Sequence, residues 1–205
     1  GGLSAPDGRL YFIEDAQISH KQEALEEGHA FRYVVVNAEG KLLDKGQLVA
    51  TGLPMMVWRL DEPVNWQTVD AFVHEGEYTG TVTVFDPSGE YTVQISRMRS
   101  RIRGNSSRWA DKKSFKMNLL NDKGEKRKLG LCGMRKDDDW ILDALSADDT
   151  RLREVSAFRL WEEIIQSNPS DRIGSRMCYM ELVADGQYQG IYGLQEPIDQ
   201  KQLNA

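Results

Sequence analysis

The chain has 205 residues, of which 40% are hydrophobic and 28% are charged, and its net charge is -6. This composition is typical of a globular protein. The acidic balance argues against general nucleic-acid binding, and no apolar run is long enough to span a bilayer.

The first fifty residues have the pattern of a small β-rich unit. The chain opens with Gly-Gly rather than Met, which favours a processed or engineered chain and leaves any targeting segment of the parent open. Residues 31–36 and 41–49 are strand-like runs around a turn that contains Gly40, which predicts a β-hairpin. We therefore expect residues 1–50 to form a small β-rich appendage or the tail of an upstream domain.

A second β-rich region extends over the middle of the chain. Strand-like runs are predicted over residues 53–58, 79–85, 91–103, 113–120 and 126–131. Thr and Val alternate in the second of these runs, which is typical of a half-buried strand. Turn residues at 86–89 and 121–124 keep the connections short, so the sequence predicts an antiparallel sheet.

Helical signals appear only in the second half of the chain. Acidic residues 137–139 precede Trp140 and predict a short helix, because acidic side chains suit the first helical turn. Asp148 is expected to cap a longer helix that ends near residue 167. Apolar residues of that helix recur at three- and four-residue spacing and would form one face. They are Leu152, Val155, Phe158, Trp161 and Ile165.

A second hairpin is predicted at the C-terminal end. Residues 177–183 and 188–194 are strand-like, and Asp185 with Gly186 supplies the turn between them. The expected fold of residues 51–205 is therefore α+β, an antiparallel β-sheet with a packed helix pair.

Basic side chains are concentrated on one predicted strand and the turn after it. Four arginines occupy alternate positions: Arg97, Arg99, Arg101 and Arg103. They would share one strand face, where their charges repel one another. Either acidic side chains pair with them, or a polyanion binds there. Residues 104–107 (GNSS) could offer backbone N–H groups and hydroxyls to an oxyanion.

The two cysteines, Cys132 and Cys178, lack the CxxC spacing of a zinc or redox site. Both are expected to be buried apolar thiols. A disulfide between them stays open if the parent protein is exported.

Several motifs of the second half follow one another in a specific order. Residues 103–107 (RGNSS) precede residues 112–115 (KKSF) by a short interval. Residues 139–158 contain DW.L.A, a later Asp and Arg, and Ala-Phe, and residues 181–199 contain EL, G.Y and EPID. Over roughly residues 53–203, this set resembles the CotH family, which consists of spore-coat-protein-H-like atypical protein kinases. Relatives usually have Asn where this chain has Glu154.

The resemblance implies an ATP-dependent protein kinase that transfers phosphoryl groups to Ser or Thr of proteins, with Mg or Mn. In the family, the acidic residues that bind metal and act in catalysis follow the last motif. Residues 51–205 would therefore be the N-terminal, nucleotide-holding portion of a CotH-like kinase domain, inactive alone. The implied partners are a nucleotide and a coat or surface protein, and the implied location is the spore coat or the exported cell surface.

The resemblance also suggests site residues, since phosphoryl transfer requires a triphosphate and metal held in line with their charge neutralised. Lys113 is the candidate catalytic lysine, with Glu154 or Asp148 as its acidic partner. Lys113 shares a strand face with Phe115, whereas Lys112 is expected to face solvent. The candidate nucleotide-binding residues are Arg101, Arg103, Asn105, Ser106, Lys112, Arg153 and Glu196.

Plainer interpretations stay open beside this one. The arginine face could belong to a non-catalytic phosphate- or polyanion-binding module, or the chain could be a structural domain of coat or surface assembly. Lys113 could be a surface strand lysine, and Glu154 a solvated helix residue. Asp138 and Asp139 are more typical of a helix start than of a metal site, so the metal ligands are left unassigned.

Overall fold

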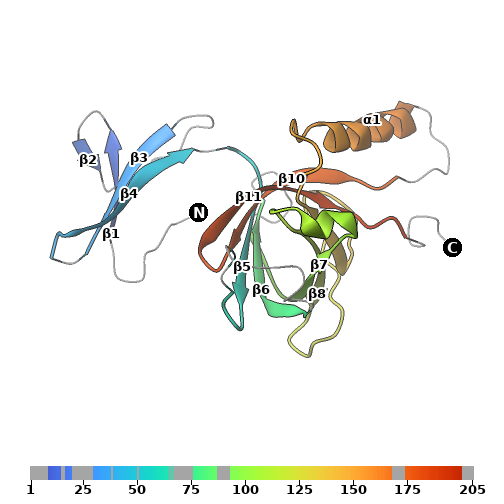
Figure 1. Cartoon of the computed structure of the whole chain (residues 1–205), viewed down its shortest axis with the longest axis horizontal. Helices are drawn as coiled ribbons and strands as arrows, with labels where there is room; N and C mark the ends of the chain where they lie inside the picture. The colour runs from blue at the N-terminus through green and yellow to red at the C-terminus, as the bar shows by residue number, and fades with distance from the viewer. Residues whose placement is uncertain are drawn as a thin grey trace. The chain divides into compact units, whose positions relative to one another are not determined.

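The computed structural model of the chain describes residues 9–14, 17–19, 30–37, 39–49, 51–64, 66, 76–86, 93–167 and 174–199. Contacts between residues divide the chain into two units, Gly1–Gly52 and Leu53–Ala205. Figure 1 shows both units.

The first unit is a four-stranded antiparallel sheet with the strand order β2-β1-β3-β4. Its strands are β1 (Arg9–Glu14), β2 (Gln17–Ser19), β3 (Ala30–Val36) and β4 (Leu42–Val49). The predicted hairpin of residues 31–49 is confirmed as β3 and β4. In its turn, the side-chain oxygen of Asn37 accepts hydrogen bonds from the N–H groups of Glu39 and Lys41 at 3.1 and 2.8 Å.

The second unit is built on a closed barrel of seven strands with the order β10-β11-β9-β8-β7-β6-β5 (Figure 1). The strands are β5 (Met55–Leu60), β6 (Tyr78–Phe85), β7 (Val93–Arg103), β8 (Ser114–Leu120), β9 (Asp139–Asp143), β10 (Met177–Ala184) and β11 (Gln187–Gln195). Neighbouring strands are antiparallel, except that β5 and β10 pair in parallel. That parallel pairing closes the barrel, so the sheet has no free edge.

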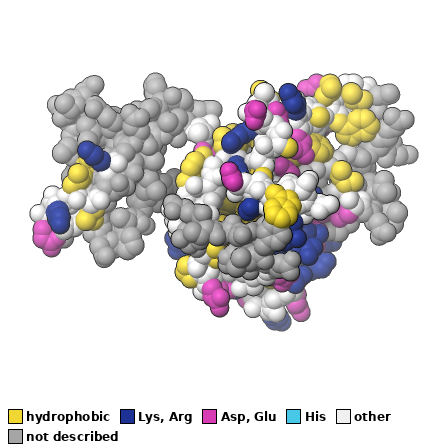
Figure 2. Space-filling view, viewed as in Figure 1, with side chains coloured by type: hydrophobic (Ala, Val, Ile, Leu, Met, Phe, Trp, Pro, Cys, Tyr) yellow, Lys and Arg dark blue, Asp and Glu magenta, His cyan; other side chains and the backbone are white. Residues whose placement is uncertain are grey.

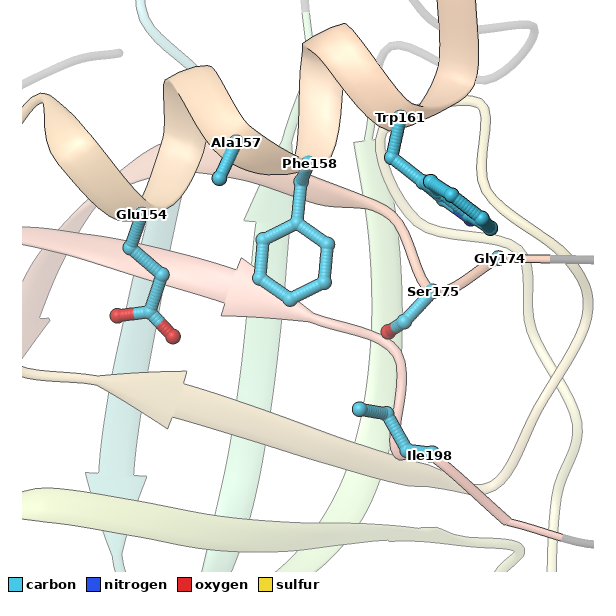
Figure 3. A pocket seen from close by; sticks show the side chains of 7 residues that line it. All are labelled: Glu154, Ala157, Phe158, Trp161, Gly174, Ser175 and Ile198. Atoms are coloured by element: carbon cyan, nitrogen blue, oxygen red, sulfur yellow. The ribbon is translucent and has the colours of Figure 1, made fainter. Parts of the chain in front are cut away.

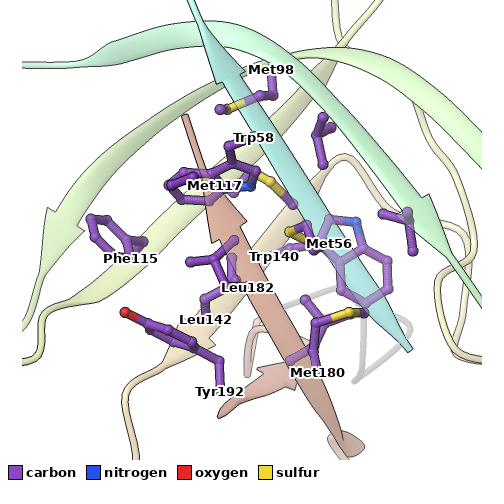
Figure 4. Packing of buried hydrophobic residues seen from close by; sticks show 14 of the residues in the cluster. Met56, Trp58, Met98, Phe115, Met117, Trp140, Leu142, Met180, Leu182 and Tyr192 are labelled. Atoms are coloured by element: carbon purple, nitrogen blue, oxygen red, sulfur yellow. The ribbon is translucent and has the colours of Figure 1, made fainter. Parts of the chain in front are cut away.

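The barrel interior is filled by large side chains that come from alternate positions of the strands (Figure 4). Trp58 belongs to an aromatic group, and its ring centroid lies 5.2 Å from that of Phe115 in an edge-to-face arrangement. Met98, Met117 and Trp140 are fully buried beside it. The outward positions of β7 carry the four arginines Arg97, Arg99, Arg101 and Arg103.

The predicted α+β fold with a packed helix pair is wrong. Among the described residues there is one α-helix, α1 (Arg153–Ser167), and the stretch expected to be the first helix is strand β9. β9 fills the gap between β8 and β11, and its Trp140 and Leu142 are completely buried in the barrel. Asp137 does not begin a helix but shapes the loop before β9, where its carboxylate accepts the N–H of Asp138 at 2.8 Å. Tertiary pairing thus outweighs the local acidic signal.

The other predicted elements of this region had mixed outcomes. Residues 126–131 form only isolated bridges, such as Leu120 with Lys126, rather than a strand. The cap of the long helix is confirmed, because a carboxylate oxygen of Asp148 accepts the N–H of Arg153 at 2.9 Å. The C-terminal hairpin is confirmed as β10 and β11, with positive φ angles at Asp185 and Gly186 in its turn.

Candidate functional site

The four arginines of β7 lie on the outer face of the barrel, and three of them have acidic partners. Arg97 binds Asp61 through two nitrogens, at 2.6 and 2.9 Å. The other two ion pairs are Arg99 with Glu77 at 3.8 Å and Arg103 with Asp143 at 3.6 Å. Figure 2 shows Lys and Arg side chains gathered on the barrel flank in the region of β7 and β8.

Arg101 differs from the other three arginines. It is exposed and has no ion pair within the described residues. Lys116 of β8 lies directly opposite in the strand register and pairs with Asp139 at 2.9 Å. The salt-bridged interpretation therefore describes Arg97, Arg99 and Arg103, and Arg101 is the arginine of this face whose charge is left for an anion.

The turn after β7 is shaped by Gly104 and the short 3-10 helix η1 (Ser106–Trp109). Gly104 has a φ of 111°, and a Cβ atom there would lie 2.0 Å from the hydroxyl oxygen of Ser107. Glycine is thus required for this backbone conformation. Asn105 and Ser106, two predicted nucleotide-binding residues, are exposed, and Asn105 makes no side-chain capping hydrogen bond to η1.

Lys113, the predicted catalytic lysine, is engaged in this same turn. Its ammonium donates hydrogen bonds to the carbonyl oxygens of Arg108 and Ala110 at 3.0 and 2.7 Å. These bonds satisfy carbonyl groups at the end of η1. The geometry gives Lys113 a role in holding the turn.

Lys112 does not face solvent, and that expectation is wrong. Its ammonium donates to the carbonyl oxygen of Ile191 in β11 and lies 4.0 Å from the centroid of the Tyr192 ring. Burial lowers the pKa of Lys112 from 10.5 to about 8, and the positive charge of Arg151 lowers it further, while Asp143 opposes the shift. Lys112 is therefore a partly desolvated cation held against β11.

Four charged side chains lie near this lysine. Antiparallel pairing brings the ends of β7 and β9 and the start of β8 to this one end of the barrel. The barrel-end cluster consists of Arg103, Lys112, Asp143, Arg151 and Glu154. Asp143 links the cluster, since it pairs with Arg103 and acts electrostatically on both Lys112 and Glu154. Burial raises the pKa of Glu154, the charge of Asp143 raises it further, and Arg103 opposes the shift.

The sequence did not single out Asp143 or Arg151. Asp143 is the first acidic residue after the buried run Trp140 to Leu142, and a charged residue directly after such a run is the signal that could have identified it. Arg151 has a positive φ of 55° in the loop before α1, which the sequence gives no means of anticipating.

Beside the cluster, α1 borders a groove of about 460 Å³ (Figure 3). Its lining residues are Glu154, Ala157, Phe158, Trp161, Gly174, Ser175 and Ile198. Trp161 lies so close to Gly174 that a Cβ atom there would be 2.3 Å from the indole ring. Glu154 belongs to both the groove and the barrel-end cluster, so it connects an apolar surface with a charged one.

The remaining predicted site residues lie in other surroundings. Arg153 is mostly exposed and pairs weakly with Asp148 at 3.7 Å. Glu196 is buried, and its two carboxylate oxygens accept the N–H groups of Arg135 and Arg176 at 2.9 and 3.0 Å. Within the described parts of the chain, no hydrogen bond or ion pair joins Arg153 or Glu196 to the cluster.

The described residues contain no group of three or more side chains arranged to hold a metal ion. Asp138 pairs with Lys126 at 3.5 Å. Within the same residues, no helix has the length and apolar character that a membrane span requires.

Comparison with known protein families gives the class of protein. The family model described as CotH kinase protein matches residues 100–205 of this 205-residue chain. The chain therefore belongs to the CotH family, as its motifs predicted, and at the level of the family it is a kinase-like or spore coat protein. The match begins at Ser100, so residues 53–99 of the predicted resemblance lie outside it. A search of the curated proteins finds no significant match.

Proposed function

We propose that this chain provides the nucleotide-holding part of an ATP-dependent protein kinase of CotH type, which phosphorylates Ser or Thr of coat or surface proteins. The observation that carries the proposal is the environment of Lys112. Its ammonium is half-buried and has no ion pair within 4 Å among the described residues, only a carbonyl group and an aromatic face. A desolvated cation of this kind gains from an anionic ligand.

A nucleotide triphosphate suits the charge of the barrel-end cluster. Lys112 and Arg151 would contact phosphate oxygens, and Arg101 and the turn of Asn105 and Ser106 would extend the cationic surface. Asp143 and Glu154 supply the carboxylates that Mg or Mn requires in addition to phosphate oxygens and water. Holding the triphosphate and neutralising its charge are the main tasks of such a site.

The proposal assigns the phosphate-binding lysine to Lys112 and gives Lys113 the task of supporting the turn. The two hydrogen bonds of Lys113 to carbonyl oxygens occupy two of its three N–H donors within its own turn. The catalytic role predicted for Lys113 stays a prediction, and a comparison of the two lysines decides between them.

Calorimetry with Mg·ATP on Lys112→Met, Lys113→Met and the exposed control Lys123→Met makes that comparison. Loss of a charged hydrogen bond to phosphate should weaken binding by Lys112→Met roughly ten- to hundredfold. Lys113→Met should lower the melting temperature more than the affinity, and Lys123→Met should change neither. If Lys113→Met loses affinity and Lys112→Met keeps it, the phosphate-binding role returns to Lys113.

A phosphate- or polyanion-binding module without catalysis is a second candidate. The observation that favours it is the exposed Arg101, which has no ion pair within the described residues. Competition between Mg·ATP and polyphosphate separates the two functions. A nucleotide site prefers ATP to tripolyphosphate, whereas a polyanion surface binds longer polyphosphate more tightly and loses it in Arg101→Ala and at high salt.

A further inference from the structure

The two cysteines of the chain lie on neighbouring segments of the fold. Cys132 lies in a turn between β8 and β9, and Cys178 is the second residue of β10. The thiol of Cys178 acts on that of Cys132 and raises its pKa. Both thiols are free, both are partly buried, and both pack against the hydrophobic core of the barrel.

The backbone segments that carry the cysteines are held together independently of the thiols. The guanidinium of Arg176 donates to the carbonyl oxygen of Gly133 at 2.7 Å. Glu196 accepts the N–H groups of Arg135 and Arg176 at 2.9 and 3.0 Å, and it is almost completely buried. The fold therefore holds the two cysteine-bearing segments side by side, which a disulfide requires if it is to form without a large movement of the backbone.

We propose that Cys132 and Cys178 form an intramolecular disulfide in an oxidising compartment. The oxidant is a disulfide of the glutathione or dithiol-oxidase class. The thiolate of one cysteine attacks the oxidant disulfide and releases one thiol, and the second cysteine then attacks the mixed disulfide and releases the other. Two electrons pass from the protein sulfurs to the oxidant sulfurs, and the two thiol protons go to the thiolates that are released.

The environment determines how readily this bond forms. Hydrogen bonding with Cys178 raises the pKa of the Cys132 thiol, and burial raises it further, so that this thiol is protonated at neutral pH. Thiol–disulfide exchange requires a thiolate, so oxidation of the two cysteines should be slow at neutral pH and faster in alkaline buffer. Partial exposure of both residues leaves a path for the oxidant.

The proposed bond would close a loop that contains β9 and the whole of α1. Asp143 and Glu154 of the barrel-end cluster lie inside that loop. A crosslink over a loop of this length restricts the unfolded chain, so the oxidised protein should be the more stable form. The disulfide is independent of the proposed kinase function, and its test uses no nucleotide.

The test is a redox titration of the full chain in glutathione buffers at pH 8, with and without urea, read by thiol titration and peptide mass mapping. The native protein should form the Cys132–Cys178 bond at glutathione ratios that leave the urea-unfolded chain reduced. The melting temperature of the oxidised protein should be higher by roughly 5–10 °C and should return to its original value after reduction with dithiothreitol.

Cys132→Ser and Cys178→Ser are the controls, and each should give only a glutathione adduct on the remaining cysteine. The proposal is overturned if both wild-type thiols stay free in fully oxidised glutathione, or if only adducts or intermolecular dimers form. Equal oxidation of the native and unfolded wild-type chains would also overturn it. This last comparison needs no variant, so it holds even if a serine variant does not fold.

Discussion

The ammonium of Lys112 lies 4.0 Å from the centroid of the Tyr192 ring. Tyr192 is a buried residue of β11, so the contact connects the segment before β8 with a strand that does not adjoin β8 in the barrel. The ring and the carbonyl group of Ile191 stabilise the cation without neutralising it. A half-buried positive charge therefore remains at the end of the barrel where β7 and β9 also end.

The first prediction is that Lys112 titrates with a pKa of about 8, below its ordinary value of 10.5. Reductive ¹³C-methylation of the lysines followed by NMR titration measures this, and Lys112→Arg identifies the resonance. A midpoint near the ordinary value would show that the side chain is solvated and does not occupy the position described.

The same pKa has a consequence for stability. Because the folded-state pKa is lowered, the unfolded chain binds more protons at this position between pH 8 and 10.5. The contribution of Lys112 to the free energy of unfolding is therefore fully present above pH 10.5 and is lost as the pH falls through about 8. The difference in melting temperature between the wild type and Lys112→Met should rise across this window, and a constant difference would contradict it.

The second prediction concerns the exposed ion pair of Asp61 with Arg97. The hydrogen bond from Arg97 lowers the pKa of Asp61 from 3.8 to about 2. A lowered carboxylate pKa stabilises the fold above pH 3.8, and this stabilisation is lost as the pH falls through about 2. NMR titration should show a return toward the ordinary pKa in Arg97→Gln. An unchanged midpoint in that variant would exclude Arg97 as the cause.

The third prediction concerns Asp185, whose carboxylate organises the chain after β5. It accepts the N–H groups of Leu60 and Val64 at 2.9 and 3.2 Å and the indole N–H of Trp66 at 3.3 Å. Asp185→Ala leaves these donors without their acceptor, so the free energy of unfolding should fall by about 2–4 kcal/mol. Asp185→Asn, which keeps one acceptor oxygen and tolerates the positive φ of this turn, should cost less.

Urea denaturation measures the effect, with Asp122→Ala in an exposed turn as the matched control. The control should change the free energy of unfolding by no more than about 0.5 kcal/mol. Equal losses in Asp185→Ala and Asp122→Ala would mean that the carboxylate of Asp185 does not hold the chain after β5.

Local patterns in the sequence predicted the hairpins because the turn residues and the strands that they join are adjacent. Asp185 and Gly186 between two apolar runs identify β10 and β11 directly. The closure of the barrel was not predictable in this way. It depends on the parallel pairing of Met55 with Glu181, two residues far apart in the sequence that no turn connects.

The wrong expectation that Lys112 faces solvent has a simple geometric cause. Alternation along a strand correctly places Phe115 inside the barrel, but β8 begins only at Ser114. The alternation therefore does not extend to Lys112 and Lys113, whose directions are set by the turn and by the neighbouring β11. In the same way, the acidic residues before Trp140 indicated a helix. The chain forms strand β9 there instead, because β9 pairs with β8 on one side and with β11 on the other.

The most direct test of the proposed nucleotide site is the Lys112 titration repeated with saturating Mg·ATP. A triphosphate bound at the barrel-end cluster would place negative charge beside the ammonium and raise its pKa from about 8 toward or above the ordinary 10.5. Lys123, which is exposed in a distant turn, serves as the internal reference and should not move. A bound nucleotide that leaves the Lys112 midpoint at about 8 would show that its phosphates lie elsewhere.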